Sequence, residues 1–208
     1  VFWFTSLGLT SISSAALMVN IHPLLVVSAG WLLLGEKFRP AALPWAALAV
    51  AGMAMLGWGD YQLAGTAFSG NLLAAAGGVM LAGYYLVGRK VRPRIPIPVY
   101  ALLVYGTSAI LLLGYNLAAS VPLAGYSSID WLAFACLAVV PTICGHTLLN
   151  WALKYLPAAT ISVSALGEPV IATALAIPIY GEVPGPLLLV GGALVVAGIW
   201  MFLQRSRN

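Results

Sequence analysis

Charged side chains are scarce in this chain. Asp, Glu, Lys and Arg make up 7% of its 208 residues, whereas apolar residues make up 62%. A soluble domain averages about 25% charged and about 45–50% apolar residues, so the composition excludes an ordinary soluble domain. The formal net charge of +4 is therefore no evidence for nucleic-acid binding, because in a membrane protein the placement of the cations matters more than their sum.

Cysteine and histidine are also rare, with two residues of each. Cys136 and Cys144 lie on one predicted helix, about 12 Å apart, whereas a disulfide needs Cα atoms within about 7 Å. We expect two free, buried thiols. Two distant histidines do not form a metal site, and the chain contains no phosphate loop or nucleophile–base pair. We therefore predict no enzymatic activity, no metal and no cofactor.

Long apolar runs fill most of the chain. A membrane-spanning helix needs about 20 mostly apolar residues, whereas the strands of a membrane β-barrel are short and alternate in polarity. Seven segments fit the helical pattern: 14–35, 40–58, 69–88, 98–119, 131–153, 158–181 and 184–204. We predict an all-α, multi-pass transmembrane bundle with seven full spans, its Gly and Ala residues allowing close helix packing.

Residues 1–9 are apolar but too few to cross a membrane. We interpret them as the remaining end of a partial helix whose beginning is absent. A short, half-inserted N-terminal segment is the alternative.

The cations are sorted between the connections. One alternate set of connections holds all nine: Lys37, Arg39, Arg89, Lys90, Arg92, Arg94, Lys154, Arg205 and Arg207. The other set holds none: residues 10–13, 59–68, 120–130 and 182–184. The positive-inside rule places the first set and the C-terminus in the cytoplasm. We predict a protein of a bacterial-type inner membrane, surrounded by the lipid bilayer, with anionic headgroups as candidate ligands of the run 89–94.

Part of the sequence repeats itself, because positions in 23–52 match positions in 169–198 at one constant spacing. The matches include Pro23 with Pro169, Gly35-Glu36 with Gly181-Glu182, and Val50-Ala51-Gly52 with Val196-Ala197-Gly198. Lys37 and Arg39 follow the first Gly-Glu, but no cation follows the second directly. This change of flanking charge indicates that the copies point in opposite directions. Inverted repeats around a central site are typical of secondary transporters.

Two Pro…Gly-Glu helices, each followed by a Gly/Ala-rich helix, resemble the drug/metabolite transporter (DMT) superfamily, in its EamA-like branch. The resemblance includes Asn150-Trp151-Ala152-Leu153 and covers nearly the whole chain. It implies inverted five-helix repeats, with residues 1–58 as the remainder of the first and 69–208 as the second. On this register the first two helices and most of the third are missing.

Pro23 and Pro169 mark candidate helix breaks, because proline cannot donate to the carbonyl four residues earlier. Freed backbone groups are tolerated in a membrane where they face protein or a watery cavity. His22 and Glu168 directly precede the two prolines, and an ionisable group at mid-membrane is a candidate functional site. We hypothesise a His22/Glu168 pair that shares or relays a proton. Neutral, hydrogen-bonded side chains beside the breaks are the structural alternative.

A second polar stretch lies in segment 131–153. His146 and Asn150 are four residues apart and share one helix face, and Trp151 adjoins them. These three side chains are candidates for lining the substrate cavity. Hydrogen bonding between helices is the alternative role of the polar pair.

Tyr84 and Ser164 complete the candidate set. An aromatic face such as that of Tyr84, or of the adjacent Tyr85, suits an organic cation, although tyrosine is also common at membrane interfaces. Ser164 lies about one turn before Glu168. Close helix packing is the alternative role of this serine.

Glu36 and Glu182 each end a predicted helix. A carboxylate at a helix C-terminus is disfavoured by the helix dipole. We expect compensation, for Glu36 by Lys37 or by the N-terminus of the next helix near Pro40.

The sequence thus predicts a secondary transporter of a small metabolite or drug-like molecule, with export implied by the resemblance and proton coupling as a hypothesis. The alternative is a non-transporting membrane scaffold, or a truncated remnant stabilised by self-association. A homodimer stays open in either case.

Overall fold

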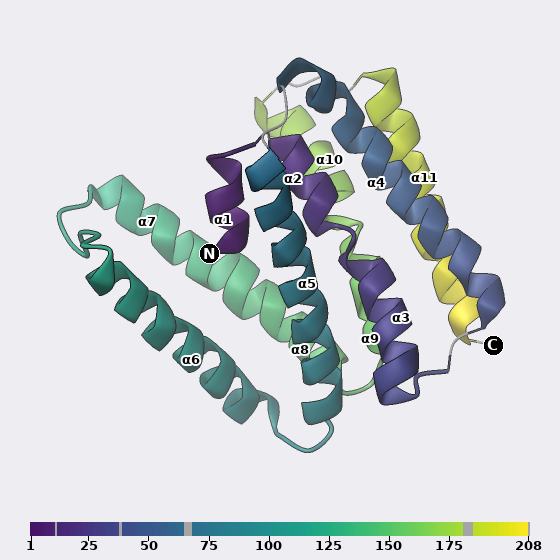
Figure 1. Cartoon of the computed structure of the whole chain (residues 1–208), viewed down its shortest axis with the longest axis horizontal. Coiled ribbons are helices and arrows are strands. Elements are labelled where there is room, and N and C mark those ends of the chain that lie inside the picture. The colour runs from purple at the N-terminus through teal and green to yellow at the C-terminus, as the bar shows by residue number, and fades with distance from the viewer. Residues whose placement is uncertain (11, 38, 65–67, 181–184, 208) are drawn as a thin grey trace. The chain divides into compact units, whose positions relative to one another are not determined.

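The computed structural model describes residues 1–10, 12–37, 39–64, 68–180 and 185–207, and every regular element in these ranges is a helix (Figure 1). The first half contains α1 (Phe2–Leu7), α2 (Ile12–Val19), α3 (His22–Leu34), the 3-10 turn η1 (Pro40–Ala42), α4 (Leu43–Ala64) and α5 (Phe68–Val91). The second contains α6 (Ile97–Ala118), α7 (Ser128–Leu137), the π-helix η2 (Ala138–His146), α8 (Thr147–Ala152), α9 (Ala158–Ala165), α10 (Glu168–Tyr180) and α11 (Pro186–Arg207).

Several helices are suited to a membrane. Within the described residues, four are long and apolar enough to cross one: Phe68–Val91, Ile97–Ala118, Ser128–Ala152 and Leu189–Ser206. Shorter apolar helices accompany them. The all-α class is therefore confirmed in the described residues, and the chain has the composition of a helical membrane protein.

The predicted segments 14–35 and 158–181 are each divided into two helices. Asn20 and Ile21 separate α2 from α3, just as Leu166 and Gly167 separate α9 from α10. Pro23 and Pro169 are the second residues of α3 and α10, where the missing N–H interrupts no intrahelical hydrogen bond. His22 and Glu168 are therefore the first residues of their helices, at equivalent positions of the sequence repeat.

Two compact units make up the chain. The first comprises Val1–Val87 and Pro157–Asn208, and the second Gly88–Leu156. Buried side chains from η1 and from α3, α4, α9 and α11, with one from the α9–α10 connection, form the core of the first unit: Val27, Ala42, Ala46, Ala49, Met53, Ala159, Val163, Leu166, Val195 and Phe202. Most of this core is alanine or valine, and small side chains let helix backbones approach closely.

The helices α4 and α11 lie side by side in the first unit (Figure 1). A Cβ atom on Gly52 would lie 2.8 Å from the backbone nitrogen of Val195, and one on Gly198 would lie 2.6 Å from that of Ala49. Higher numbers on α4 thus meet lower numbers on α11, so the two helices run antiparallel. In the sequence repeat, Gly52 is equivalent to Gly198 and Ala49 to Val195, so the two contacts are equivalent as well.

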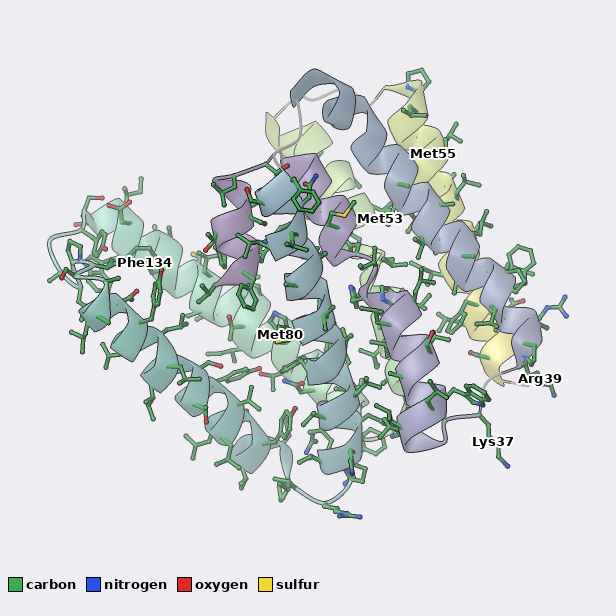
Figure 2. All side chains as sticks on the ribbon, viewed as in Figure 1. Lys37, Arg39, Met53, Met55, Met80 and Phe134 are labelled. Carbon is green, nitrogen blue, oxygen red and sulfur yellow. The ribbon has the colours of Figure 1, made fainter. Side chains whose placement is uncertain are left out.

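The cations of the first unit gather at one of its ends. Lys37 and Arg39 are exposed and point away from the ribbon between α3 and α4 (Figure 2). The η1 turn shares a core cluster with the last turns of α11, which brings the C-terminal end of the chain beside these cations. At the other end, the Thr10 hydroxyl donates to Oδ1 of Asn71 over 2.9 Å, in a stretch of sequence without cations. Two of the predicted cationic connections are therefore neighbours in space.

The second unit contains α6, α7, η2 and α8. A capping box begins α7, in which the Ser127 hydroxyl accepts from the Asp130 backbone and the Asp130 carboxylate accepts from the Ser127 backbone. Most side chains of α6 and α7 are exposed, as expected for lipid-facing helices. Cys136 and Cys144 are free but also exposed. The expectation of buried thiols was wrong, because an apolar side chain in a membrane needs no cover from protein.

Candidate functional site

His22 occupies the break between α2 and α3 and is only 1% exposed. Its Nδ1 lies 3.2 Å from the carbonyl oxygen of Val19. Because a carbonyl only accepts, Nδ1 carries the proton of the neutral ring and Nε2 keeps the lone pair. Nε2 is buried without a hydrogen-bond partner among the described residues, although the backbone of Ser162 on α9 lies beside the ring. A neutral imidazole is thus held inside the first unit.

Tyr85 packs against His22 and lies near Glu168. Its ring, 2% exposed, lies with its centroid 5.7 Å from that of His22, and the charge of Glu168 acts on its hydroxyl. Glu168 is itself exposed and begins α10, where the helix dipole favours a carboxylate. The three side chains come from α3, α5 and α10, so the two predicted ionisable residues share one neighbourhood through a tyrosine.

Tyr84 borders this cluster, and Ser164 lies on α9. Tyr84 is half-buried, and its ring centroid lies 5.7 Å from that of Tyr85. The exposed hydroxyl of Ser164 donates to the carbonyl of Thr160 over 2.8 Å. This bond to its own helix is common for serine in helices and leaves the hydroxyl oxygen able to accept from a ligand.

The residues of the polar stretch in the second unit differ in their exposure. Asn150 is fully buried, whereas His146 and Trp151 are exposed. The Trp151 ring lies with its centroid 5.0 Å from that of Tyr155. The shared helix face predicted for His146 and Asn150 spans the junction of η2 with α8, where the π-helix changes the angular spacing of side chains.

Tyr105 fastens α6 to this junction. Its hydroxyl lies 3.0 Å from the hydroxyl oxygen of Thr147 and 3.3 Å from the carbonyl oxygen of Thr142. The Thr142 carbonyl already accepts the π-helical bond from the Thr147 backbone, and the tyrosine hydroxyl is a further donor to the same oxygen. The polar stretch therefore has a fixed attachment on α6.

Two arginines at the end of α5 bind the end of α8. Nη1 of Arg89 donates to the carbonyls of Leu153 and Lys154, each over 3.0 Å. Nε of the buried Arg92 donates to the carbonyl of Asn150 over 2.8 Å. These two members of the cationic run therefore contact protein, while Lys90 and Arg94 are exposed.

Glu36 caps a helix of the other sequence copy. Its Oε1 accepts from the backbone nitrogen of Ala158, the first residue of α9, over 2.9 Å. Gly35, at φ +63°, lets the chain turn after α3, and a Cβ on Gly30 would lie 2.9 Å from Oε2 of Glu36. The N-terminus of α9, which the sequence did not predict, thus compensates the Glu36 carboxylate. The prediction for Glu182 lies outside the described residues.

Among the described residues, no group of three His, Cys, Asp or Glu side chains could hold a metal ion. A buried imidazole and a carboxylate at helix breaks, in a helical membrane chain, are features of secondary transporters.

Comparison with known proteins agrees with this class. The model of the EamA-like transporter family matches residues 68–204, and the chain belongs to that family. The predicted resemblance to the EamA-like branch of the DMT superfamily is confirmed. This family is one of transporters.

Two curated relatives are named as exporters. The chain is 28% identical to the "Probable terminal-alkyne amino-acid exporter" of Streptantibioticus cattleyicolor, with 93% of this chain and 64% of the relative aligned. It is 29% identical to the "Aromatic amino acid exporter YddG" of Ancylobacter novellus, with 95% and 69% aligned. The chain thus spans about two thirds of the length of these relatives.

A solved crystal structure shares the fold. Its TM-score is 0.84 at 28% identity, covering 99% of this chain and 72% of the solved one. The described helices therefore follow an arrangement already observed by experiment.

The sequence left open which of Tyr84 and Tyr85 faces the site, because an almost uniformly apolar helix gives no signal for its buried face. Tyr85 is the one that contacts His22. Sequence reasoning missed the burial of Arg92. Arg92 was interpreted only as part of a cationic run. Its neighbours Pro93 and Pro96, which force a tight connection, were the available signal that this arginine turns back onto protein.

Proposed function

We propose that this chain belongs to a secondary transporter that exports amino acids or related small metabolites by alternating access, coupled to protons at His22 and Glu168. The observation that carries the proposal is the pair of equivalent helix breaks. Each copy of the repeat places one ionisable residue at the first position of a helix, directly before a proline. Discontinuous helices of inverted repeats commonly form the binding sites of such transporters.

Inversion of the two repeats, 1–58 and 69–208, is supported by α4 and α11. When a two-fold axis relates two helices, every contact between them occurs twice, once in each direction. The contact of Gly52 with Val195 and that of Gly198 with Ala49 form such a pair. Because the helices are antiparallel, the axis would lie across them, in the membrane plane.

The orientation follows from charge. We propose seven crossings of a bacterial-type inner membrane, with the C-terminus in the cytoplasm. The gathering of Lys37, Arg39 and the C-terminal end at one end of the first unit supports this placement, because cytoplasmic loops carry the excess of cations. A homodimer stays a prediction.

The site chemistry suits a zwitterion. The N-terminus of α3 carries partial positive charge and no carboxylate, and would attract the carboxylate of an amino acid beside His22. Glu168 would attract its ammonium group, and the rings of Tyr84 and Tyr85 suit either the ammonium group or an aromatic side chain. The exporters of amino acids among the relatives favour this substrate class.

Protonation of His22 would strengthen the contact between α3 and α9. A proton taken up at Nε2 of His22 turns this nitrogen from an acceptor into a donor. The backbone of Ser162 lies beside the ring, so a protonated ring would bind α9 and an unprotonated one would not. Glu168, at the start of α10, is the exchange partner. Ser164 is proposed as a further substrate contact of the first unit. His146, Asn150 and Trp151 are proposed as substrate contacts of the second.

Flux into proteoliposomes tests the proposal. A panel of labelled aromatic and aliphatic amino acids and small organic cations would be compared with and without an imposed proton gradient. The wild-type chain, Glu168→Gln and His22→Gln would be run side by side. Asp130→Asn is the matched control, because it makes the same carboxylate-to-amide change in an exposed helix cap.

We expect gradient-dependent flux that Glu168→Gln abolishes, that His22→Gln uncouples from the gradient and that Asp130→Asn leaves intact. Equal gradient dependence in the wild type and all the variants would reject the coupling role of His22 and Glu168. Absence of flux for the whole panel would contradict transport by this chain.

A further inference from the structure

Arg92 is a buried cation whose described hydrogen-bond partners are backbone carbonyls. It is 2% exposed, and Nε donates to the Asn150 carbonyl over 2.8 Å. Nη1 donates to the carbonyl of Ile95, and the guanidinium lies 5.5 Å from the ring centroid of Tyr100. Burying a charge is expensive unless it is paired or hydrogen-bonded. A fully buried arginine in this setting therefore has a specific task.

The end of α8 explains the task. The last carbonyls of a helix lack intrahelical partners and carry partial negative charge. The backbone nitrogen of Lys154 bonds to Trp151 rather than to Asn150, which leaves the Asn150 carbonyl to Arg92. Arg89 takes the carbonyls of Leu153 and Lys154. Two guanidinium groups thus replace the missing turn of helix.

Arginine suits this position better than lysine. Its planar fork donates in several fixed directions at once and stacks on an aromatic ring, as Arg92 does between Asn150, Ile95 and Tyr100. Gly88 lets the parts come together, since a Cβ there would lie 2.7 Å from Cδ1 of Leu153 and 3.1 Å from the Tyr100 hydroxyl.

We propose that Arg92 is a positioning residue that, with Arg89, holds the end of α8 and thereby fixes the side chain of Asn150 for substrate binding. Asn150 is fully buried, and its own carbonyl is the atom that Arg92 binds. Loss of this bond frees the last turn of α8 and lets the carboxamide shift. The role in substrate binding rests on the proposed function, whereas the hold on α8 does not.

Hydrogen exchange of the full chain in lipid nanodiscs tests whether Arg92 stabilises the end of α8. Arg92→Met removes the donors but keeps an apolar chain of similar length, and Arg94→Met is the matched control because Arg94 is exposed. We expect exchange of the amides of 147–156 to rise about tenfold or more in Arg92→Met and to change less than about twofold in Arg94→Met. The exchange rate of Arg92→Lys should lie between those of the other two variants. If Arg92→Met fails to fold, Arg92→Lys is compared with the wild type in its place. Unchanged exchange in the Arg92 variants would show that Arg92 does not stabilise the end of α8.

Transport kinetics test the positioning role. In a chain that transports, we expect Arg92→Lys to raise KM at least about threefold with little change in kcat, because a displaced Asn150 weakens substrate binding. Asn150→Ala should raise KM as well, and Arg92→Lys should add little to it. Raised exchange with an unchanged KM would overturn the positioning role. A wild type without flux would instead contradict the proposed function, and the exchange comparison would still decide the hold on α8.

Discussion

Gly52 on α4 and Gly198 on α11 meet each other's helix in the same way. A Cβ on Gly52 would lie 2.7 Å from the carbonyl oxygen of Gly191, and one on Gly198 would lie 2.8 Å from that of Trp45. Trp45 and Gly191 are themselves equivalent positions of the sequence repeat. The repeat seen in the sequence is therefore also a repeat of contacts, made at a close approach of two helix backbones.

Alanine at either glycine should destabilise the protein by a similar amount. The added methyl group must push backbone atoms apart, which costs about 1–3 kcal/mol. We expect Gly52→Ala and Gly198→Ala to lower the melting temperature in detergent, each by about the same number of degrees. Gly83→Ala is the control, because no atom lies within 4 Å of its added Cβ. A large effect at only one of the two glycines would contradict the reciprocal packing.

The cap that Glu36 places on α9 should be measurable. Removing a helix N-cap costs about 0.5–2 kcal/mol, so Glu36→Ala should lower the melting temperature, whereas Lys37→Ala should not. Gly30→Ala should have part of the same effect, because its Cβ would displace Oε2 of Glu36. Additive losses in the double variant Gly30→Ala, Glu36→Ala would show that the two residues act separately.

The hydroxyl of Tyr105 should stabilise the second unit. Hydrogen bonds between membrane helices contribute about 0.6–1.7 kcal/mol, and this hydroxyl contacts Thr147 and Thr142. Tyr105→Phe should therefore lower the melting temperature, while Tyr115→Phe, at an exposed site, serves as the control. Equal melting of the two variants would contradict the attachment.

Tyr85 should matter more for transport than Tyr84. Tyr85→Phe keeps the ring beside His22 but removes the hydroxyl on which Glu168 acts. We expect it to lower proton-driven flux about tenfold, which corresponds to about 1.4 kcal/mol. Tyr84→Phe is expected to lower it less. The reverse order in the same proteoliposomes would contradict the role proposed for Tyr85.

Much of the helical layout could be predicted because a membrane leaves strong signals. Runs of apolar residues mark α5, α6 and α11, and Pro23 and Pro169 fall where the two breaks occur. The repeat anticipates that His22 and Glu168 take equivalent positions. These features depend on local sequence, which a single chain displays directly.

Contacts between helices could not be predicted in the same way. Apolar residues surround each helix on all sides, so periodicity does not reveal that Tyr85 is buried and Tyr84 only half-buried. Nothing local pairs Glu36 with Ala158, which is 122 residues away. The burial of Arg92 likewise depends on carbonyls that only the folded α8 presents.

Labelling of two equivalent residues tests the inverted repeats most directly. Thr10 and Leu156 are equivalent at the spacing of the repeat, and the charge pattern places them on opposite sides of the membrane. Thr10→Cys and Leu156→Cys would be made separately with Cys136 and Cys144 replaced by serine, and treated with a membrane-impermeant thiol reagent in intact cells and in inverted vesicles. We predict that Thr10→Cys reacts only from outside and Leu156→Cys only from the cytoplasmic side. Reaction of both from the same side would contradict the inversion, and with it the proposed mechanism of alternating access.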